Sequence, residues 1–219
     1  MNKQNRFLPT TKEEMKQRGW DELDVVLITG DAYIDSPFMG IAVVGRILED
    51  IGLRVGIIGQ PDINSDVDIK RLGEPKLFWG VSGGSIDSMV SNYTATKKFR
   101  NDDDYTAGGK NNKRPDRATL VYTNLIRRYF KNTAPIVLGG IEASLRRLTH
   151  YDYWSNTLRK PILFDSKADY MVYGMGEQAI IDLGLYLKEG KDVRTIAGLC
   201  YISKEPVKEY LQIPSHKEC

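Results

Sequence analysis

The feature that most constrains this fold is a short, fully apolar, β-branched run followed by a segment with helical periodicity. Val25–Ile28 is the first such run, and Val55–Ile58 follows a stretch in which apolar residues recur at helical spacing between Ile41 and Ile51. A run without polar alternation is typical of a strand that is buried on both faces. A strand, a helix and a second strand within about thirty residues predict a βαβ unit with two parallel strands.

The same pattern recurs with variations through the middle of the chain. Because strands and helices alternate, the sequence predicts an α/β fold of the flavodoxin-like or Rossmann-like type, built on a parallel sheet. The further strands are predicted at Leu77–Val81, Ile136–Leu138 and Tyr170–Tyr173, and the further helices at residues 85–94, 115–129, 142–148 and 177–188.

Three parts of the chain are predicted from these patterns. Residues 1–23 form an N-terminal capping segment, residues 24–196 form the parallel α/β domain, and residues 197–219 form a C-terminal segment. Within this last segment, Leu199–Ile202 and Val207–Ile213 are predicted to pair as an antiparallel β-hairpin, since the second of them alternates apolar and polar residues.

Composition excludes several classes of protein. The 219 residues include 31 Lys and Arg against 29 Asp and Glu, and the resulting charge of +2 gives no general attraction to nucleic acid or to an anionic membrane. No apolar run approaches the roughly 20 residues of a membrane span, and the first residues lack the apolar stretch of a signal peptide, so we expect a cytoplasmic protein without a membrane partner. Two cysteines and two histidines are too few for a disulfide framework or a four-cysteine zinc site, and no metal ligand is predicted.

Glycine-rich loops follow four of the predicted strands and define a candidate binding edge. In an open parallel sheet the ligand crevice lies outside the carboxyl ends of the strands. Glycine allows a ligand to approach the backbone closely, and the helix that follows presents free amide groups. Glycines also make tight turns in any α/β fold, so a purely structural role is the alternative for each loop. The candidate ligand-binding residues are Gly30, Asp31, Asp35, Ser82, Gly83, Gly84, Gly139, Gly140, Glu142, Gly174, Gly176 and Glu177, and no catalytic residue is assigned.

One of these loops has the shape of a dinucleotide-binding fingerprint. Gly174-x-Gly176-x-x-Ala179 follows a predicted strand and opens a predicted helix. However, that fingerprint belongs at the first strand of the fold, and about 20 residues further on, where an acidic residue is expected, Arg194 and Thr195 stand. The sequence therefore argues against a nicotinamide or flavin cofactor.

The charged residues near this edge have ordinary explanations as well. Glu142 and Glu177 lie in the first turns of predicted helices, where the helix dipole favours carboxylates in any protein. Asp31 and Asp35 could hold a cation or ligand hydroxyls, but aspartate is also a common turn residue. Basic pairs such as Arg146–Arg147 are spread along the chain, which is typical of a solvated surface rather than a nucleic-acid footprint.

Four longer strings resemble a known family. They are TGDAYIDSPFMG (Thr29–Gly40), RPDRATLVYTN (Arg114–Asn124), LGGIEASLRRLTHYDYWSN (Leu138–Asn156) and DSKADYMVYGMGE (Asp165–Glu177). On these strings the chain resembles, from Phe7 to its end, the N-terminal part of the YgiQ-type radical SAM proteins. The resemblance implies the leading α/β domain of a much longer protein, related in fold to the cobalamin-binding domains that precede radical SAM barrels.

The resemblance also implies cofactors for the full-length protein. The family's CxxxCxxC loop holds a [4Fe–4S] cluster that cleaves S-adenosylmethionine to a 5′-deoxyadenosyl radical. Cys200 and Cys219 do not have that spacing, so this chain carries no cluster ligand. Base-off cobalamin binding in the related fold uses the histidine of Asp-x-His-x-x-Gly, and Pro37 stands in its place between Asp35 and Gly40. The sequence therefore argues against cobalamin here.

Three functional hypotheses follow from these patterns. The first is an accessory, substrate-side domain of a radical SAM enzyme, whose partner is a barrel that residues 197–219 would connect to it. The second is a stand-alone module that binds a small molecule or nucleotide at the glycine-rich edge without radical chemistry. The third is an RNA-interaction domain, since several radical SAM enzymes modify RNA. Neither the substrate nor the reaction follows from the sequence.

Overall fold

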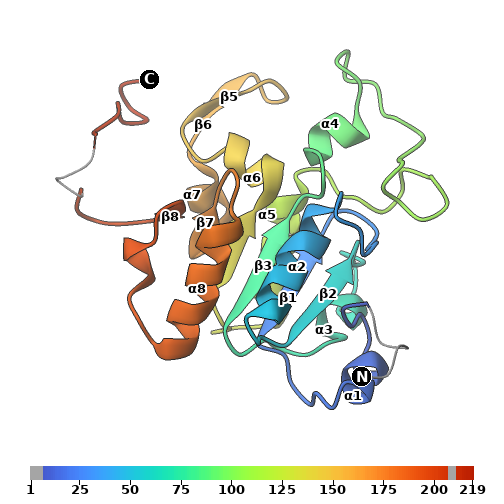
Figure 1. The fold of residues 1–219 in the computed structure, drawn as a ribbon. Helices are drawn as coiled ribbons and strands as arrows, with labels where there is room; N and C mark the ends of the chain where they lie inside the picture. The colour runs from blue at the N-terminus through green and yellow to red at the C-terminus, as the bar shows by residue number, and fades with distance from the viewer. Residues whose placement is uncertain (1–6, 207–210) are drawn as a thin grey trace.

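The computed structural model describes residues 7–206 and 211–219 (Figure 1). Within these residues the central sheet has six strands, five of them parallel, while the strand at one end runs antiparallel to its neighbour. This confirms the predicted parallel α/β fold. In spatial order the strands are β2 (Val55–Gly59), β1 (Val25–Thr29), β3 (Phe78–Ser82), β4 (Ile136–Gly139), β7 (Tyr170–Val172) and β8 (Leu199–Tyr201).

Helices cover both faces of this sheet, as a buried parallel sheet requires. One face packs against α2 and α8, and the other packs mainly against α5, which α3 and α7 contact in turn. The short helix α6 follows β4 directly, and the short helix α4 follows β3 after a loop. The helices are α1 (Lys12–Gln17), α2 (Gly40–Asp50), α3 (Val67–Lys70), α4 (Ser88–Asn92), α5 (Ala118–Tyr129), α6 (Gly140–Leu145), α7 (Ile162–Ser166) and α8 (Glu177–Glu189), with a 3₁₀ turn at Val193–Thr195.

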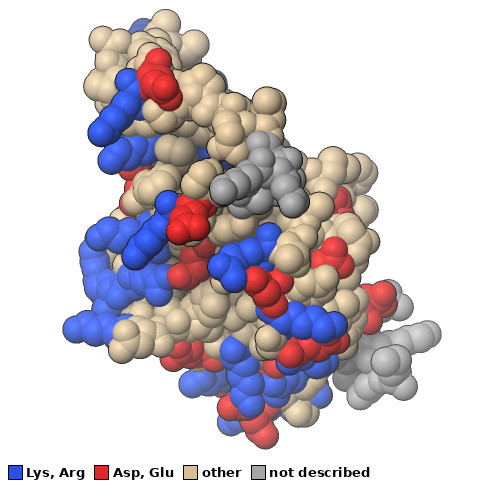
Figure 2. Space-filling view, turned by 90° about the vertical axis from the view of Figure 1, so that its left-hand side faces the viewer, with Lys and Arg blue, Asp and Glu red and all other residues tan. Residues whose placement is uncertain are grey.

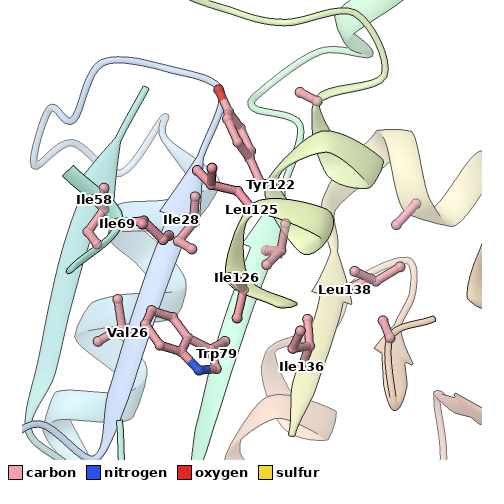
Figure 3. Close-up of a cluster of buried hydrophobic side chains, with 14 of the residues drawn as sticks. Val26, Ile28, Ile58, Ile69, Trp79, Tyr122, Leu125, Ile126, Ile136 and Leu138 are labelled. Carbon is pink, nitrogen blue, oxygen red and sulfur yellow. The ribbon is translucent and has the colours of Figure 1, made fainter. Parts of the chain in front are cut away.

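Alternate residues of the central strands build two separate cores. Val26 and Ile28 of β1 join the core beneath α5, whereas Val25 and Leu27 join the core beneath α2 and α8. Figure 3 shows the first core, with Trp79 of β3 among the side chains between α5 and the sheet. All five residues of β1 are buried, which explains why its sequence has no polar alternation.

The N-terminal segment is part of this packing. Thr11 and Glu14 form a capping box at the start of α1, in which each side chain accepts a hydrogen bond from the other's backbone amide. Leu8, Met15 and Leu23 are all buried, with Leu8 in one core and the other two in the opposite one. Residues 7–23 therefore tie the two layers together at their margin.

The antiparallel pair at the C-terminal end differs in its partner from the predicted hairpin. β8 pairs with β7, and Met171 lies opposite Cys200. Of the predicted second strand, residues 207–210 lie outside the described part of the chain, and residues 211–213 form no strand. Leu211 is 90% exposed, so its apolar character is not used in this packing.

Two excursions leave the sheet at its carboxyl edge. Residues 93–114 run between α4 and α5 with only two isolated β-bridges, and the hairpin of β5 (His150–Asp152) and β6 (Thr157–Arg159) follows α6. Figure 1 shows both at the upper end of the molecule. The tip of the hairpin packs on the long loop, since the Tyr93 and Trp154 ring centroids are 4.8 Å apart. No helix in the described part of the chain is both long and apolar enough to cross a bilayer.

Candidate functional site

A cavity of about 370 Å³ opens at the carboxyl edge of the sheet, between α2 and α8. Its deep end is apolar and is lined by Leu27 of β1, Gly80 of β3, Val137 of β4, Val44 of α2 and Ile180 of α8. Its mouth is formed by the loops that follow β1, β3, β4 and β7. Volumes of this size are typical of small-molecule sites.

The cavity brings together most of the candidate residues predicted from the sequence. Each of the four glycine-rich loops contributes backbone to it, because the parallel strands end at the same edge. Ser85, which the sequence prediction did not include, also lines it. The predicted residues that line the cavity are Asp31, Ser82, Gly84, Gly139, Gly140, Gly174, Gly176 and Glu177.

Gly30 and Gly83 do not line the cavity but allow its rim to form. A Cβ atom on Gly30 would lie 2.1 Å from the carbonyl oxygen of Gly83, so the loops after β1 and β3 touch backbone to backbone. Gly84 has a φ of +114°, and a Cβ there would lie 2.2 Å from Oδ1 of Asp31. Glycine is required at these positions because neighbouring segments approach so closely that a side chain would not fit. This is the structural role that the sequence analysis gave as the alternative to ligand binding.

Asp31 is held in place beside the cavity by two partners, the partly buried Ser85 and the buried Arg114. Its Oδ2 accepts a 2.6 Å hydrogen bond from the amide of Ser85, and its Oδ1 lies 2.9 Å from Nη2 of Arg114. The same Nη2 lies 3.1 Å from Asp103, and all three charged side chains are almost completely buried. Burial raises the pKa of Asp31, and the hydrogen bond from Ser85 and the charge of Arg114 offset this only in part. Arg114 thus couples the long loop to the rim of the cavity.

Sequence reasoning missed the role of Arg114. The residue lies at the end of a polar, Gly- and Asn-rich loop, where an arginine is usually solvated. Its partners are 83 and 11 positions away in the chain (114 − 31 and 114 − 103), a separation that no local pattern reveals. A run of three aspartates, residues 102–104, was the one signal that acidic partners were at hand.

Asp35 and Glu142, both candidate ligand-binding residues in the sequence analysis, do not line the cavity. Asp35 accepts hydrogen bonds from Arg46 on the next helix and lines a shallower neighbouring groove. Glu142 is 2% exposed, and its two carboxylate oxygens accept 2.9 Å hydrogen bonds from the amides of Ser88 and Thr119. It satisfies free amides at the starts of α4 and α5, which is a structural role.

The cavity has a distinct electrostatic character. None of the described residues that line it is Lys, Arg or His. Asp31 is paired with Arg114, which leaves Glu177, a partly exposed side chain, as the unpaired charge among the described lining residues. In the described part of the chain, no three His, Cys, Asp or Glu side chains are grouped so as to hold a metal ion. The site therefore suits a ligand whose buried part is uncharged.

Ion pairs anchor the second excursion near the same edge. Arg117, just before α5, lies 2.6 Å from Asp152 of β5, whose carboxylate also accepts hydrogen bonds from Ser155. Burial alone would raise the pKa of Asp152, but the bonds from Ser155 and Arg117 outweigh it and hold the pKa well below the usual range of aspartate. Arg146 pairs with Asp87, whose side chain caps the start of α4.

Comparison with known proteins places the chain among longer relatives. The family described as Radical SAM N-terminal matches residues 7–219. A UPF0313 protein of Fusobacterium nucleatum is 61% identical over 98% of this chain, and one of Thermotoga maritima is 54% identical over 97%. The chain spans 38% of the length of each of these relatives.

Solved structures show the same fold. The radical S-adenosylmethionine methyltransferase TsrM of Kitasatospora setae superposes on 83% of this chain with a TM-score of 0.55 and 20% sequence identity, and the match covers 29% of the TsrM chain. One of its structures holds a tryptophan substrate and an S-adenosylmethionine analogue, and another holds cobalamin and a [4Fe–4S] cluster. At this identity the likeness is one of fold.

Proposed function

We propose, from the premise that this chain belongs to the radical SAM N-terminal family, that it is the small-molecule-binding domain on the substrate side of a radical SAM enzyme. The [4Fe–4S] cluster and S-adenosylmethionine would be bound by the rest of the longer protein. The observation that carries the proposal is the cavity of about 370 Å³ at the carboxyl edge of the sheet. Its candidate ligand-binding residues are those predicted residues that line it.

The lining supports a ligand whose buried part is apolar and uncharged. Leu27, Val137 and Ile180 offer contacts to an apolar group, and the described lining has no cation to neutralise a phosphate or carboxylate. Burying an unpaired charge in such surroundings is costly. Serine hydroxyls and the Glu177 carboxylate at the mouth are available to hydroxyl or amine groups on the outer part of the ligand. This favours an apolar, uncharged group over a nucleoside polyphosphate.

The residues present do not fit cobalamin held through a protein ligand to cobalt. TsrM, which shares the fold, binds cobalamin in one of its structures. Here Pro37 lines the cavity, and none of the described lining residues is histidine or cysteine. The described lining therefore supplies no imidazole nitrogen or thiolate to the metal, and we derive no chemistry through that cofactor.

The stand-alone module uses the same cavity and differs only in lacking a barrel, so the length of the relatives favours the radical SAM interpretation. For RNA binding, neither the net charge of +2 nor the face shown in Figure 2 offers support. Figure 2 shows Lys and Arg side chains interspersed with Asp and Glu over the face that it presents. A nucleic-acid footprint is instead a patch or stripe of one sign.

A pair of fluorescent probes tests the proposal on the 219-residue chain. N-phenyl-1-naphthylamine is uncharged, and 8-anilino-1-naphthalenesulfonate is the same ring system with a sulfonate. We expect the uncharged probe to bind saturably, and the sulfonate to bind about tenfold or more weakly because its charge finds no cation in the cavity. Equal or tighter binding of the sulfonate would contradict the proposed ligand class.

Matched variants locate the binding site. A Cβ atom on Gly139 would have no neighbour nearer than 3.9 Å, so Gly139→Leu adds a side chain within the cavity lining without a clash at Cβ. We expect this variant to weaken the uncharged probe about tenfold. Val67→Leu, at a 72% exposed position on α3, is the control and should bind as the parent does. Unchanged binding by Gly139→Leu would remove the cavity as the site.

A further inference from the structure

Exposed apolar side chains stand on opposite sides of the cavity's mouth. Phe38, in the loop before α2, is 91% exposed and lines the mouth on one side. Met175 is 90% exposed and lies between Gly174 and Gly176, which line the other side. Soluble proteins seldom leave a contiguous group of large apolar side chains in water unless something binds there.

Helix α6 extends this surface. Ile141 is 43% exposed and directly follows Gly140 of the cavity lining, and Leu145 is 61% exposed. Between them, Ser144 accepts a 3.2 Å hydrogen bond from the amide of Gly174, which fixes α6 beside the loop that carries Met175. Phe38, Ile141, Leu145 and Met175 are therefore exposed apolar side chains around the mouth, where Glu177 is the charged neighbour, and we call these four the mouth surface.

We propose that the remainder of the longer polypeptide covers the mouth surface, so that the cavity is closed at an interface between two domains. This inference rests on the proposed function. The length of the relatives supports this occupant. The chain spans 38% of each relative, so most of each polypeptide lies outside this domain and is available to cover it. The position of the mouth surface beside the cavity supports it as well, because ligand sites occur preferentially between domains and interface cores are depleted of charge. The ligand would then contact both domains.

Carbene footprinting under anaerobic conditions, read by mass spectrometry, tests this without any substitution. The 219-residue chain and the longer polypeptide that carries it are labelled in parallel. We expect labelling of Phe38 and Met175 to fall by about tenfold in the longer polypeptide, as for side chains moved from water to an interface core. Val67, which is 72% exposed on α3 and not part of the mouth surface, should label equally in both.

Two outcomes would overturn the inference. Equal labelling of Phe38 and Met175 in both proteins would leave the mouth surface uncovered by the rest of the polypeptide. Protection that already appears in the 219-residue chain and grows with its concentration would assign the surface to a second copy instead. The probe titration is independent of both results, so a failed ligand site and a failed interface are told apart.

Discussion

The two faces of the sheet differ most at the edge where they share the same loops. On the α5 face, large side chains such as Tyr122 and Trp79 are completely buried and fill the space between helix and sheet (Figure 3). On the α2 and α8 face, the same strands end above an apolar cavity. One face is a packed core, and the other is a core left incomplete at its rim.

The difference lies in what holds the loops in place. On the filled face, buried polar groups fix them: Arg114 joins Asp31 to Asp103, and Glu142 binds the amides that begin α4 and α5. An apolar cavity forfeits packing energy. The open face therefore keeps its shape because the loops are fastened from the opposite side. Substitutions on the two faces should separate stability from binding.

The largest effect is expected from removing the cation of the filled face. Arg114→Met leaves Asp31 and Asp103 buried without their partner, and we expect the free energy of unfolding to fall by about 3–5 kcal/mol, measured by urea titration. The loss should grow as pH rises from about 4 to about 7, which begins near the usual pKa of aspartate. Burial raises the pKa of Asp31 in the folded parent, and removing the charge of Arg114, which opposes that rise, raises it further. The folded variant therefore holds a proton at low pH and loses stability relative to the parent as that proton leaves.

An exposed ion pair provides the control for this substitution. Lys76 lies 2.5 Å from Glu22, but both side chains are more than half exposed. Lys76→Met should cost less than about 1 kcal/mol. Similar losses for the two variants would mean that the buried network does not fasten the loops.

A smaller effect is expected from the glycines of the rim. Gly30→Ala places a methyl group against the Gly83 carbonyl, and both positions belong to backbone that cannot easily move apart. The variant should destabilise the chain by roughly 1–3 kcal/mol in the same titration. Gly40→Ala also changes a glycine at this edge, but its Cβ meets open space at the first residue of α2. That variant should be within about 0.5 kcal/mol of the parent. Equal costs would show that the close approach of the loops is not what requires glycine.

The smallest effect is expected from the hairpin beyond the edge. Asp152→Asn weakens the bonds from Arg117 and Ser155 and should cost about 1 kcal/mol at pH 7. Because the folded pKa of Asp152 is lowered, its contribution is complete above the usual aspartate pKa and declines as pH falls through and below about 4. Unfolding titrations of both proteins should therefore converge in acid. A constant difference at every pH would exclude this charge as the cause.

Local patterns predicted much of the fold and part of the site. Runs such as Val25–Ile28 predicted strands correctly, because a strand that is buried on both faces has no polar residues. Asp35 and Glu142 were expected at the ligand site, but a position after a strand does not reveal a residue's partners. Asp35 binds Arg46, and Glu142 binds the amides at the starts of α4 and α5. The hairpin of β5 and β6 escaped prediction because its polar, partly exposed residues carry no clear period. Long-range pairing decides such positions.

The central claim is that the open face holds an uncharged ring in the cavity between α2 and α8. A crystal structure of the 219-residue chain soaked with N-phenyl-1-naphthylamine tests it most directly. We predict density for the ring system against Leu27, Val137 and Ile180, with the filled face unchanged. Density for the probe only on the mouth surface, with none in the cavity, would contradict the account.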